Sequence, residues 1–301
     1  MGKTAILLVA TLIAVPLLAY LDTPMSAFQW NMIGTVTLLM LCFALACFVT
    51  GEITGNVSQV DKLWSITPVI YAWVMAAKSG MDGRMLLMAL VATVWGARLT
   101  YNFSRHGGYS WKFWTGHEDY RWAEVRKMPE FSSPMAWKVF HFGFICLYQN
   151  ALLLLITLPM VKCASGASTL SGLDFLLALI FLALVALETW ADQEQWNFQA
   201  EKKRRLAAGE PLTGRYESGF IHDGLWAYSR HPNYLAEQSI WVVFYLFSVS
   251  AVGFNWTVAG CLLLILLFQG SSNMSEGLQA KKYPRYADYQ SRVPRFIPRF
   301  R

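Results

Sequence analysis

Eight long apolar segments are the feature that most limits how this chain can fold. Each is close to the roughly 20 residues that an α-helix needs to cross a bilayer, although the last two are short. The break between those two, at residues 253–255, predicts either one tight hairpin or one long bent segment. The segments cover residues 4–21, 31–50, 63–79, 84–104, 135–160, 172–195, 236–252 and 255–270.

The composition supports a membrane protein. Of the 301 residues, 55% are hydrophobic and only 15% are charged, and the mean hydropathy is +0.35. Such values are typical of a polytopic membrane protein rather than of a soluble domain. We expect an all-α polytopic membrane helix bundle with about 7–8 transmembrane helices. Lys3 before the first segment resembles the start of a signal peptide, but seven more apolar segments follow, so we expect a retained helix.

The positions of lysine and arginine predict the orientation of the bundle. If both termini share one side, that side carries 20 of the 25 basic residues. Cytoplasmic loops of membrane proteins are enriched in lysine and arginine. We therefore expect both termini, and the polar connections at residues 105–134 and 196–234, to face the cytoplasm. An active site there suits the endoplasmic reticulum or a bacterial inner membrane equally well.

Several common chemistries have no signature in this chain. The five cysteines are scattered, mostly within apolar runs, and form no CxxC pair, so we expect free, buried thiols and neither disulfides nor a metal site. There is no GxGxxG after a strand, no Walker loop, no HExxH and no GxSxG. No basic and aromatic array on a soluble module indicates a nucleic-acid partner.

The most informative stretch is GLWAYSRHPNYLAE at residues 224–237, which places many polar side chains at the mouth of a membrane helix. Pro232 suits the first turn of that helix, where a missing N–H does no harm. Arg230 and His231 then lie beside a helix N-terminus, which favours an anion such as phosphate. One interpretation is a basic interfacial collar that holds the helix in register. The other is a binding site for a phosphate-bearing cofactor.

Several charged residues fall where lipid is expected. Arg98 lies late in the fourth segment, and Asp61 lies at the start of the third. Glu188 and Asp192 are four residues apart, so they share one helix face, which Gln195 continues. The structural interpretation is a buried pair of Arg98 with a carboxylate that only locks helices together. The functional one is a cavity open to the cytoplasm, because intramembrane charges usually line a pathway or a site.

Two cytoplasmic stretches allow a similar choice. The run Lys202-Lys203-Arg204-Arg205 suits lipid headgroups. Guanidinium groups also bind the 2′-phosphate or the pyrophosphate of a dinucleotide well. In the tail, tyrosines at positions 283, 286 and 289 make one face of a short helix, suited to stacking on a ligand or covering a site.

These motifs resemble those of one family. The chain is similar to the integral membrane proteins of the steroid 5-alpha-reductase C-terminal type, the DUF1295 group, and to the related sterol C14- and C7-reductases. The resemblance covers about residues 57–300, so residues 56–301 would form a steroid-reductase-like membrane domain behind N-terminal transmembrane helices in residues 1–55. It depends on VDKLW at 60–64, WGARL at 95–99, EDYRW at 118–122, Asp192-Gln193, the stretch at 224–237, and Glu276 with a tyrosine-rich tail that ends in VPRFIP.

The resemblance implies an NADPH-dependent oxidoreductase that reduces a carbon–carbon double bond, conjugated to a carbonyl, in a steroid-like or other lipid. The protein would hold the nicotinamide C4 against the alkene, and a nearby acid would stabilise the enolate oxygen and supply the proton. The cofactor residues of the family map onto Asp192, Arg204, Arg205, Trp226, Tyr228, Arg230, His231, Asn233, Tyr234, Glu237, Glu276 and Tyr286.

The residues that would act on the substrate are Asp61, Trp95 and Arg98. In steroid 5-alpha-reductases, a glutamate and a tyrosine from two N-terminal membrane helices approach the substrate carbonyl. Here Asp61 stands at the glutamate position, one methylene shorter, and Trp95 stands on or near the tyrosine position. An indole N–H donates a hydrogen bond but cannot serve as a proton acid. Tyr71 and Tyr101 are the alternatives for that role.

Two other classes of function remain open. Isoprenylcysteine and phospholipid methyltransferases carry a similar Arg-His-Pro-x-Tyr string, so the chain could bind S-adenosylmethionine. Against this, Asp192 and the tetrabasic run suit a phosphate-rich ligand better than an uncharged adenosine. The third class is a non-catalytic sterol-binding membrane protein that keeps the fold without the chemistry, which the tryptophan at position 95 permits.

Overall fold

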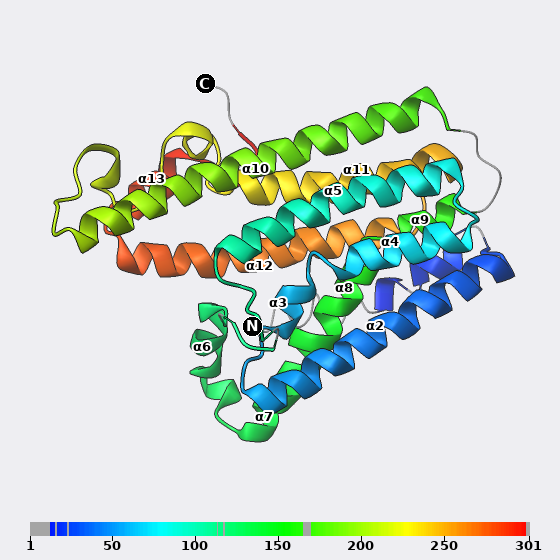
Figure 1. Ribbon diagram of the computed structural model, residues 1–301, viewed down its shortest axis with the longest axis horizontal. Helices are drawn as coiled ribbons and strands as arrows, with labels where there is room; N and C mark the ends of the chain where they lie inside the picture. The colour runs from blue at the N-terminus through cyan, green and yellow to red at the C-terminus, as the bar shows by residue number, and fades with distance from the viewer. Residues whose placement is uncertain are drawn as a thin grey trace.

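The structure, a computed structural model, describes residues 13–15, 17–22, 24–112, 114–116, 118–164 and 170–298. Every regular element in these residues is helical, and the longest helices lie side by side in one elongated bundle (Figure 1). The predicted all-α polytopic membrane bundle is therefore confirmed.

Six stretches of the described chain are long and apolar enough to cross a membrane. Five are single helices: α2 (Ala27–Thr54), α5 (Gly83–Arg105), α10 (Gly172–Ala207), α11 (Pro232–Val252) and α12 (Val258–Lys282). The sixth runs through α7 (Pro134–Phe140), the π-helix η2 (His141–Tyr148), α8 (Gln149–Leu155) and α9 (Pro159–Cys163). The predicted pair at the end of the chain is thus a hairpin of two separate helices, α11 and α12.

Two predicted spans are not among these six. The helix α4 (Thr67–Lys78) has only 12 residues, fewer than a perpendicular crossing needs. The predicted segment at 4–21 lies mostly outside the described residues, of which 13–15 and 17–21 are helical. The expectation that both termini face the cytoplasm stays a prediction.

Two helices run well past the ends that their apolar residues predict. Apolarity alone would end α10 at residue 195 and α12 at residue 270, but they end at Ala207 and Lys282. At 1.5 Å per residue, the 36 residues of α10 measure about 54 Å, against about 30 Å for the hydrocarbon core of a bilayer. The ends of both helices therefore project from the membrane, and α10 carries the basic run 202–205 with it.

Side chains fix the helix starts at the opposite end of the bundle. Ser26 and Gln29 form a capping box at the start of α2, and Ser171 and Asp174 form another at the start of α10. Asp174 also receives Arg84 of α5 in a bidentate pair, with Nε–Oδ1 at 2.8 Å and Nη2–Oδ2 at 3.0 Å. This buried pair joins α5 to α10 and so aligns the two helices that form the walls of the site.

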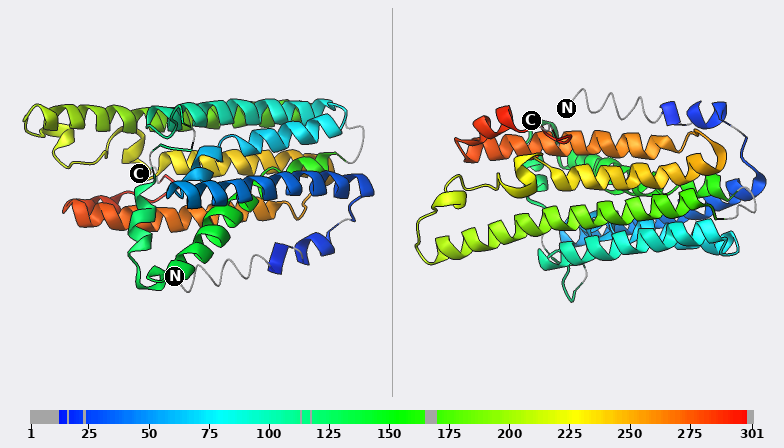
Figure 2. Two further views of the ribbon diagram at one scale, coloured as in Figure 1. Left: turned by 60° about the horizontal axis from the view of Figure 1, so that its bottom comes forward. Right: turned by 90° about the horizontal axis from the view of Figure 1, so that it is seen from above.

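Six short elements lie in the left and central part of the molecule as drawn in Figure 1. Figure 2 shows the same molecule from two further directions. They are α3 (Gln59–Leu63), α6 (Tyr120–Arg126), α13 (Tyr286–Arg292) and the 3-10 turns η1 (Pro129–Phe131), η3 (Gly214–Tyr216) and η4 (Gly224–Ala227). This part of the molecule holds the connections rich in lysine and arginine, so it is the end of the bundle that the sequence assigns to the cytoplasm.

The WGARL motif owes its glycine to close helix packing. A Cβ atom at Gly96 would lie 2.7 Å from the carbonyl oxygen of Ser65, so only glycine allows α5 to approach the connection between α3 and α4. Beside it, the fully buried Trp95 packs edge-to-face on Trp241 of α11, with ring centroids 4.8 Å apart. This packing holds α5 in the rotation that turns Arg98 toward α10.

All five cysteines are free thiols in the structure. Four of them are buried as predicted, but Cys42 is exposed on the outer surface of α2, so the expectation of burial was wrong there. An apolar run predicts a membrane helix without telling which of its faces is turned to lipid.

Candidate functional site

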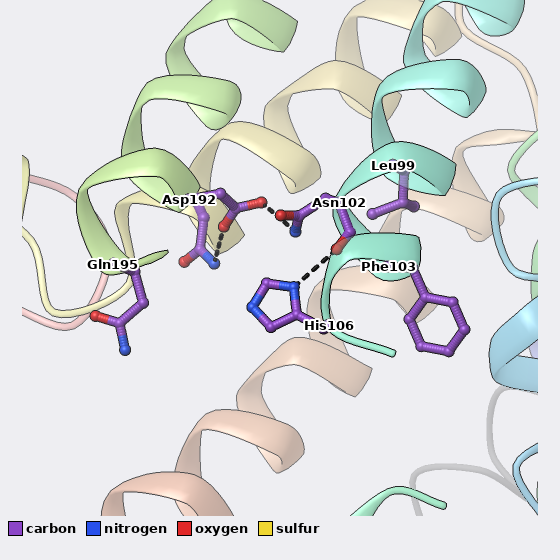
Figure 3. Close-up of a pocket in the computed structure, with 7 residues that line it drawn as sticks. Leu99, Asn102, Phe103, His106, Asp192 and Gln195 are labelled. Carbon is purple, nitrogen blue, oxygen red and sulfur yellow. Dashed lines mark hydrogen bonds between the residues drawn. The ribbon is translucent and has the colours of Figure 1, made fainter. Parts of the chain in front are cut away.

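A cavity of about 320 Å³ opens between α5, α10 and the start of α11, toward the end of the bundle that the sequence assigns to the cytoplasm (Figure 3). Five of its seven lining residues are polar, namely Asn102, His106, Asp192, Gln195 and Asn233, and the other two are Leu99 and Phe103. Two of these residues, Asp192 and Asn233, were predicted from the sequence as cofactor ligands, and the structure brings them together.

A set of buried charges adjoins the cavity through Asp192. Arg98 bonds to Glu188, with Nη1–Oε1 at 2.8 Å, and pairs with Asp192 through Nη2. The Nδ2 atom of Asn233 donates to Asp192 Oδ1 at 2.9 Å. With Glu237 of α11, these residues form what we call the cavity cluster: Arg98, Glu188, Asp192, Asn233 and Glu237. Arg98 thus forms the buried carboxylate pair that was one interpretation, and a cavity opens beside it.

Amide and imidazole groups border the rest of the cavity. Asn102, one turn after Arg98, donates to Asp192 Oδ2 at 2.8 Å. His106 Nδ1 lies 2.7 Å from the carbonyl oxygen of Asn102, which leaves Nε2 as an acceptor. The Oε1 atom of Gln195 is buried and has no hydrogen-bond donor within the described part of the chain. A ligand with amide or hydroxyl donors would satisfy it.

The indole N–H of Trp95 is already engaged within the protein and does not face the cavity. Its indole N–H donates to Glu237 Oε2 at 2.7 Å, and Trp241 donates to the other oxygen, Oε1, at 3.1 Å. The side chain of Trp95 is 0% exposed. Its bond to Glu237 explains the tryptophan at this position, because it satisfies a carboxyl group buried in the bundle.

A second charged cluster surrounds Glu276 of α12. Its carboxylate receives Arg230 through Nε at 2.9 Å and Nη2 at 3.1 Å, and it lies 2.8 Å from His231 Nε2. Gln290 donates to it at 3.0 Å and Arg295 at 3.1 Å. We call these five residues the tail cluster. The anion that Arg230 and His231 were predicted to attract is, in this structure, an internal carboxylate.

The same segment anchors the C-terminal tail through its backbone. The N–H groups of Arg230 and His231 donate to the carbonyl oxygens of Pro294 and Arg295 at 2.9 and 3.1 Å. The guanidinium of Arg230 also donates to the carbonyl oxygen of Val293. The Ser-Arg-His-Pro string and the VPRFIP tail are therefore two sides of one contact.

The other predicted cofactor residues lie apart from the cavity. Trp226 is buried and donates to the carbonyl oxygen of Ala191 at 3.3 Å, and Tyr286 is buried among the aromatic side chains of the tail. Tyr228 is 55% exposed. Tyr234 stacks on His231 at 5.2 Å, beside the tail cluster.

Arg204 and Arg205 lie near the projecting end of α10 and already have acidic partners. Arg204 pairs with Glu201 and Glu210, and Arg205 pairs with Glu201. Lys202 donates to Gly219 and Tyr283. Lys203 and Arg204 are both exposed, but Lys203 has no ion-pair partner among the described residues.

Asp61, the predicted acid, lies in α3 on the other side of α5. Its Oδ2 atom is buried and accepts no hydrogen bond from the residues that the structure describes. Burial, opposed by Ser58 and by the Arg121 guanidinium, raises the pKa of Asp61 to about 6. A carboxyl group with a pKa near neutrality is suited to donate a proton.

Of the two candidate tyrosines, the structure favours Tyr71. Tyr101 is 67% exposed on the outer face of α5, whereas Tyr71 is fully buried in α4. The hydroxyl of Tyr71 has no hydrogen-bond partner in the described ranges.

Sequence reasoning missed Asn102, His106 and the two apolar residues that line the cavity. The signal for Asn102 was present, because it follows Arg98 by four residues and so shares its helix face. His106 is the C-cap residue of α5, and nothing in the local pattern favours a ligand contact over a solvated turn at this position.

A comparison with protein families gives a match that includes both the cavity and Glu276 of the tail cluster. The family described as "Protein of unknown function (DUF1295)" matches residues 47–293. The chain belongs to the DUF1295 family. The match confirms the predicted group and takes in Asp61, the cavity and Glu276. The DUF1295 match begins within α2, so that helix contributes to the family region.

The chain is also similar to a protein from fission yeast. This protein, "Uncharacterized protein C594.04c" of Schizosaccharomyces pombe, is 36% identical over 289 residues. The aligned region covers 90% of the DUF1295 chain described here and 82% of the yeast protein. No solved structure matches the chain.

Proposed function

We propose that this DUF1295 protein is an NADPH-dependent reductase that saturates a polarised carbon–carbon double bond in a lipid. The cavity between α5, α10 and α11 is the observation that supports the proposal most directly. Its volume of about 320 Å³ falls at the small end of the range for ligand sites, so it suits the nicotinamide and ribose end of a dinucleotide.

The lining of the cavity fits that end of the cofactor. A nicotinamide carboxamide has both donors and acceptors, and ribose hydroxyls have the same. Gln195 offers an unpartnered oxygen within the described residues, and His106 and the amides of Asn102 and Asn233 offer further polar groups. Orphan polar atoms in a buried site are costly unless a ligand pairs with them.

The phosphates of the cofactor have a candidate partner further along α10. Lys203 follows Asp192 by 11 residues, about three helical turns, so the two share a face and are about 16 Å apart along the helix. Arg204 and Arg205, the residues predicted for this role, point elsewhere and are neutralised by Glu201 and Glu210. We therefore transfer the phosphate contact to Lys203.

The substrate carbonyl would be held by acids of α3 and α4, with the double bond next to the cavity. Asp61 and Tyr71 are the acids there, and each has an unpartnered buried oxygen in the part of the chain that is described. Asp61, with its pKa raised to about 6, would give its proton to the developing enolate. NADPH, when bound, supplies the hydride from its nicotinamide C4.

The spacing from Asp192 to Lys203 argues against the methyltransferase alternative. S-adenosylmethionine carries no phosphate, and it would leave Lys203 without a role. The sterol-binding alternative differs from the reductase only in turnover, because it retains the same cavity.

Binding and turnover measurements test the proposal. Purified protein in lipid nanodiscs is heated with NADPH, NADH or S-adenosylmethionine, because a ligand that binds only the folded state raises Tm. We expect the largest rise with NADPH. Consumption of NADPH is then measured on a panel of lipids with a carbonyl-conjugated double bond.

The outcomes separate the three classes. A rise in Tm with S-adenosylmethionine and none with NADPH would identify a methyltransferase. NADPH binding without turnover on any member of the panel would favour the non-catalytic alternative.

A further inference from the structure

Two buried glutamates face each other directly below the cavity. The helices α10 and α11 are antiparallel neighbours, and the hydrogen bond between Asp192 and Asn233 fixes their register. One turn deeper, Glu188 of α10 therefore comes opposite Glu237 of α11. The two residues are 5% and 4% exposed, and their carboxyl groups lie within hydrogen-bond reach of each other.

Hydrogen bonding around this pair is incomplete in a specific way. Both oxygens of Glu237 accept an indole N–H, from Trp95 and Trp241. Glu188 Oε1 is bound by Arg98, but Glu188 Oε2 is buried and has no donor among the described residues. A carboxylate cannot donate, so the two carboxyl groups can pair only if one of them carries a proton.

The net charge of the cavity cluster also indicates that one carboxyl group is protonated. One guanidinium, that of Arg98, faces the three carboxyl groups of Glu188, Asp192 and Glu237. The other groups that face the pair, Trp95 from α5 and Trp241 from α11, are neutral. Full ionisation would leave two uncompensated negative charges inside an apolar bundle, where such charges are expensive. One shared proton reduces the excess to a single negative charge.

We propose that Glu188 and Glu237 share one proton and release it when a positive charge forms in the cavity above them. This inference rests on the proposed function, which places the nicotinamide ring in that cavity. The ring is neutral in NADPH and positive in NADP⁺. A positive charge one helical turn away favours the second carboxylate, so the shared O–H bond breaks as the ring is oxidised.

The protons released and taken up are balanced over a full turnover. Reduction of a double bond consumes one hydride and one proton, and the glutamate pair yields one proton when the hydride leaves. That proton passes through the cavity to solvent and balances the one that Asp61 must regain after it has protonated the substrate. The pair takes up a proton again when NADP⁺ dissociates and the excess negative charge returns.

Proton release on cofactor binding tests this coupling without any substrate. NADP⁺ and NADPH are each added to the protein in weakly buffered solution with a pH indicator. We expect NADP⁺ to release up to one more proton per bound molecule than NADPH does. Glu188→Gln should abolish this difference, because it removes the shared proton. Glu210→Gln, which changes an exposed carboxylate just past the end of α10, should leave it intact. Equal release with the two cofactors, both bound, would overturn the coupling.

Infrared spectroscopy of the cofactor-free protein tests the shared proton itself. In an Asp61→Asn background, which removes the other candidate acid, we expect the carbonyl stretch of a protonated carboxyl group at neutral pH. It should disappear in both Glu188→Gln and Glu237→Gln, and its absence in the background protein would overturn the proposal. If neither dinucleotide binds, the proposed function fails, but the infrared band still decides whether the pair holds a proton.

Discussion

The cavity cluster and the tail cluster are built from the same kinds of side chain but are paired differently. In the tail cluster, four donors surround the carboxylate of Glu276, and the predicted anion site is filled from within. In the cavity cluster, carboxyl groups outnumber cations, and Glu188 Oε2 has no donor among the described residues. Gln195, which lines the cavity beside the cluster, also has an oxygen without a donor in these residues. The donors to Glu276 come from within the chain and hold the tail in place, whereas the excess of carboxyl groups around Arg98 marks the place where a ligand or a proton is needed.

The residues of the most conspicuous motif of the sequence, at 224–237, are shared between the two clusters. Within residues 224–237, Arg230 and His231 belong to the tail cluster and dock the C-terminus. Asn233 and Glu237 belong to the cavity cluster and lie in the first and second turns of α11. A single short string therefore serves both architecture and the candidate site, because Pro232 starts the helix between the two groups.

Removing the centre of the tail cluster should have the largest effect. Glu276→Ala leaves Arg230 and Arg295 without their carboxylate, and breaking a buried ion pair typically costs about 3–5 kcal/mol. We expect a strongly lowered Tm in thermal unfolding. Glu201→Ala, which removes an exposed partner of Arg204 and Arg205, is the control and should cost less than about 1 kcal/mol. Equal losses in the two variants would contradict the structural role of the tail cluster.

Turnover should depend on Asp61 rather than on the tail. Asp61→Asn removes the acid, and general acid catalysis is typically worth about 10²–10⁴-fold, so we expect kcat to fall at least about 100-fold. The affinity for NADPH, measured by titration, should be nearly unchanged because Asp61 lies outside the cavity.

The pH profile of the same reaction checks this acid independently. The pKa of Asp61 is raised to about 6, and only the protonated form can donate, so the rate should fall as pH rises through 6. This limb should be missing in the residual activity of Asp61→Asn. A variant that keeps both the rate and the limb would show that another group is the acid.

A neutral substitution inside the cavity cluster should affect binding more than stability. Asp192→Asn keeps the size of the side chain, and Arg98 retains Glu188 as its partner. We expect Kd for NADPH to rise about tenfold, equivalent to about 1.4 kcal/mol, with only a small change in Tm. A large loss of Tm with normal affinity would place Asp192 with the structural groups instead.

The smallest expected effect concerns the far end of the cofactor. Lys203→Ala should raise Kd for NADPH a few-fold at low salt, since an exposed charge contributes little and is screened. NADH lacks the 2′-phosphate, and its affinity should not change. Arg204→Ala is the matched control, because its guanidinium is already paired. A larger effect of Arg204→Ala than of Lys203→Ala would restore the assignment made from the sequence.

The sequence was sufficient where a local pattern carries the information. Apolar length predicted the membrane helices, and the four-residue spacing of Glu188 and Asp192 placed both carboxyl groups on Arg98. It failed for the ends of α10 and α12, because helix propensity continues after apolarity stops.

The partners of the basic residues could not be predicted from the sequence, for a different reason. Arg230 and Glu276 are 46 residues apart, and only the folded chain brings them together. The basic run at 202–205 likewise reads as one charged block, although its members are turned to different sides of α10. Which charges remain unpaired is decided by tertiary contacts, and that is the property that separates the two clusters.

Filling the cavity tests the central claim most directly. Gln195→Trp places a bulky side chain in the cavity without altering any charge, and Ala200→Trp places the same side chain on an exposed position of α10. Titration of the purified proteins with NADPH should show saturable binding to the wild type and to Ala200→Trp, and loss of binding for Gln195→Trp at unchanged Tm. Equal binding by all three proteins, or no binding by the wild type, would contradict the assignment of this cavity to the cofactor.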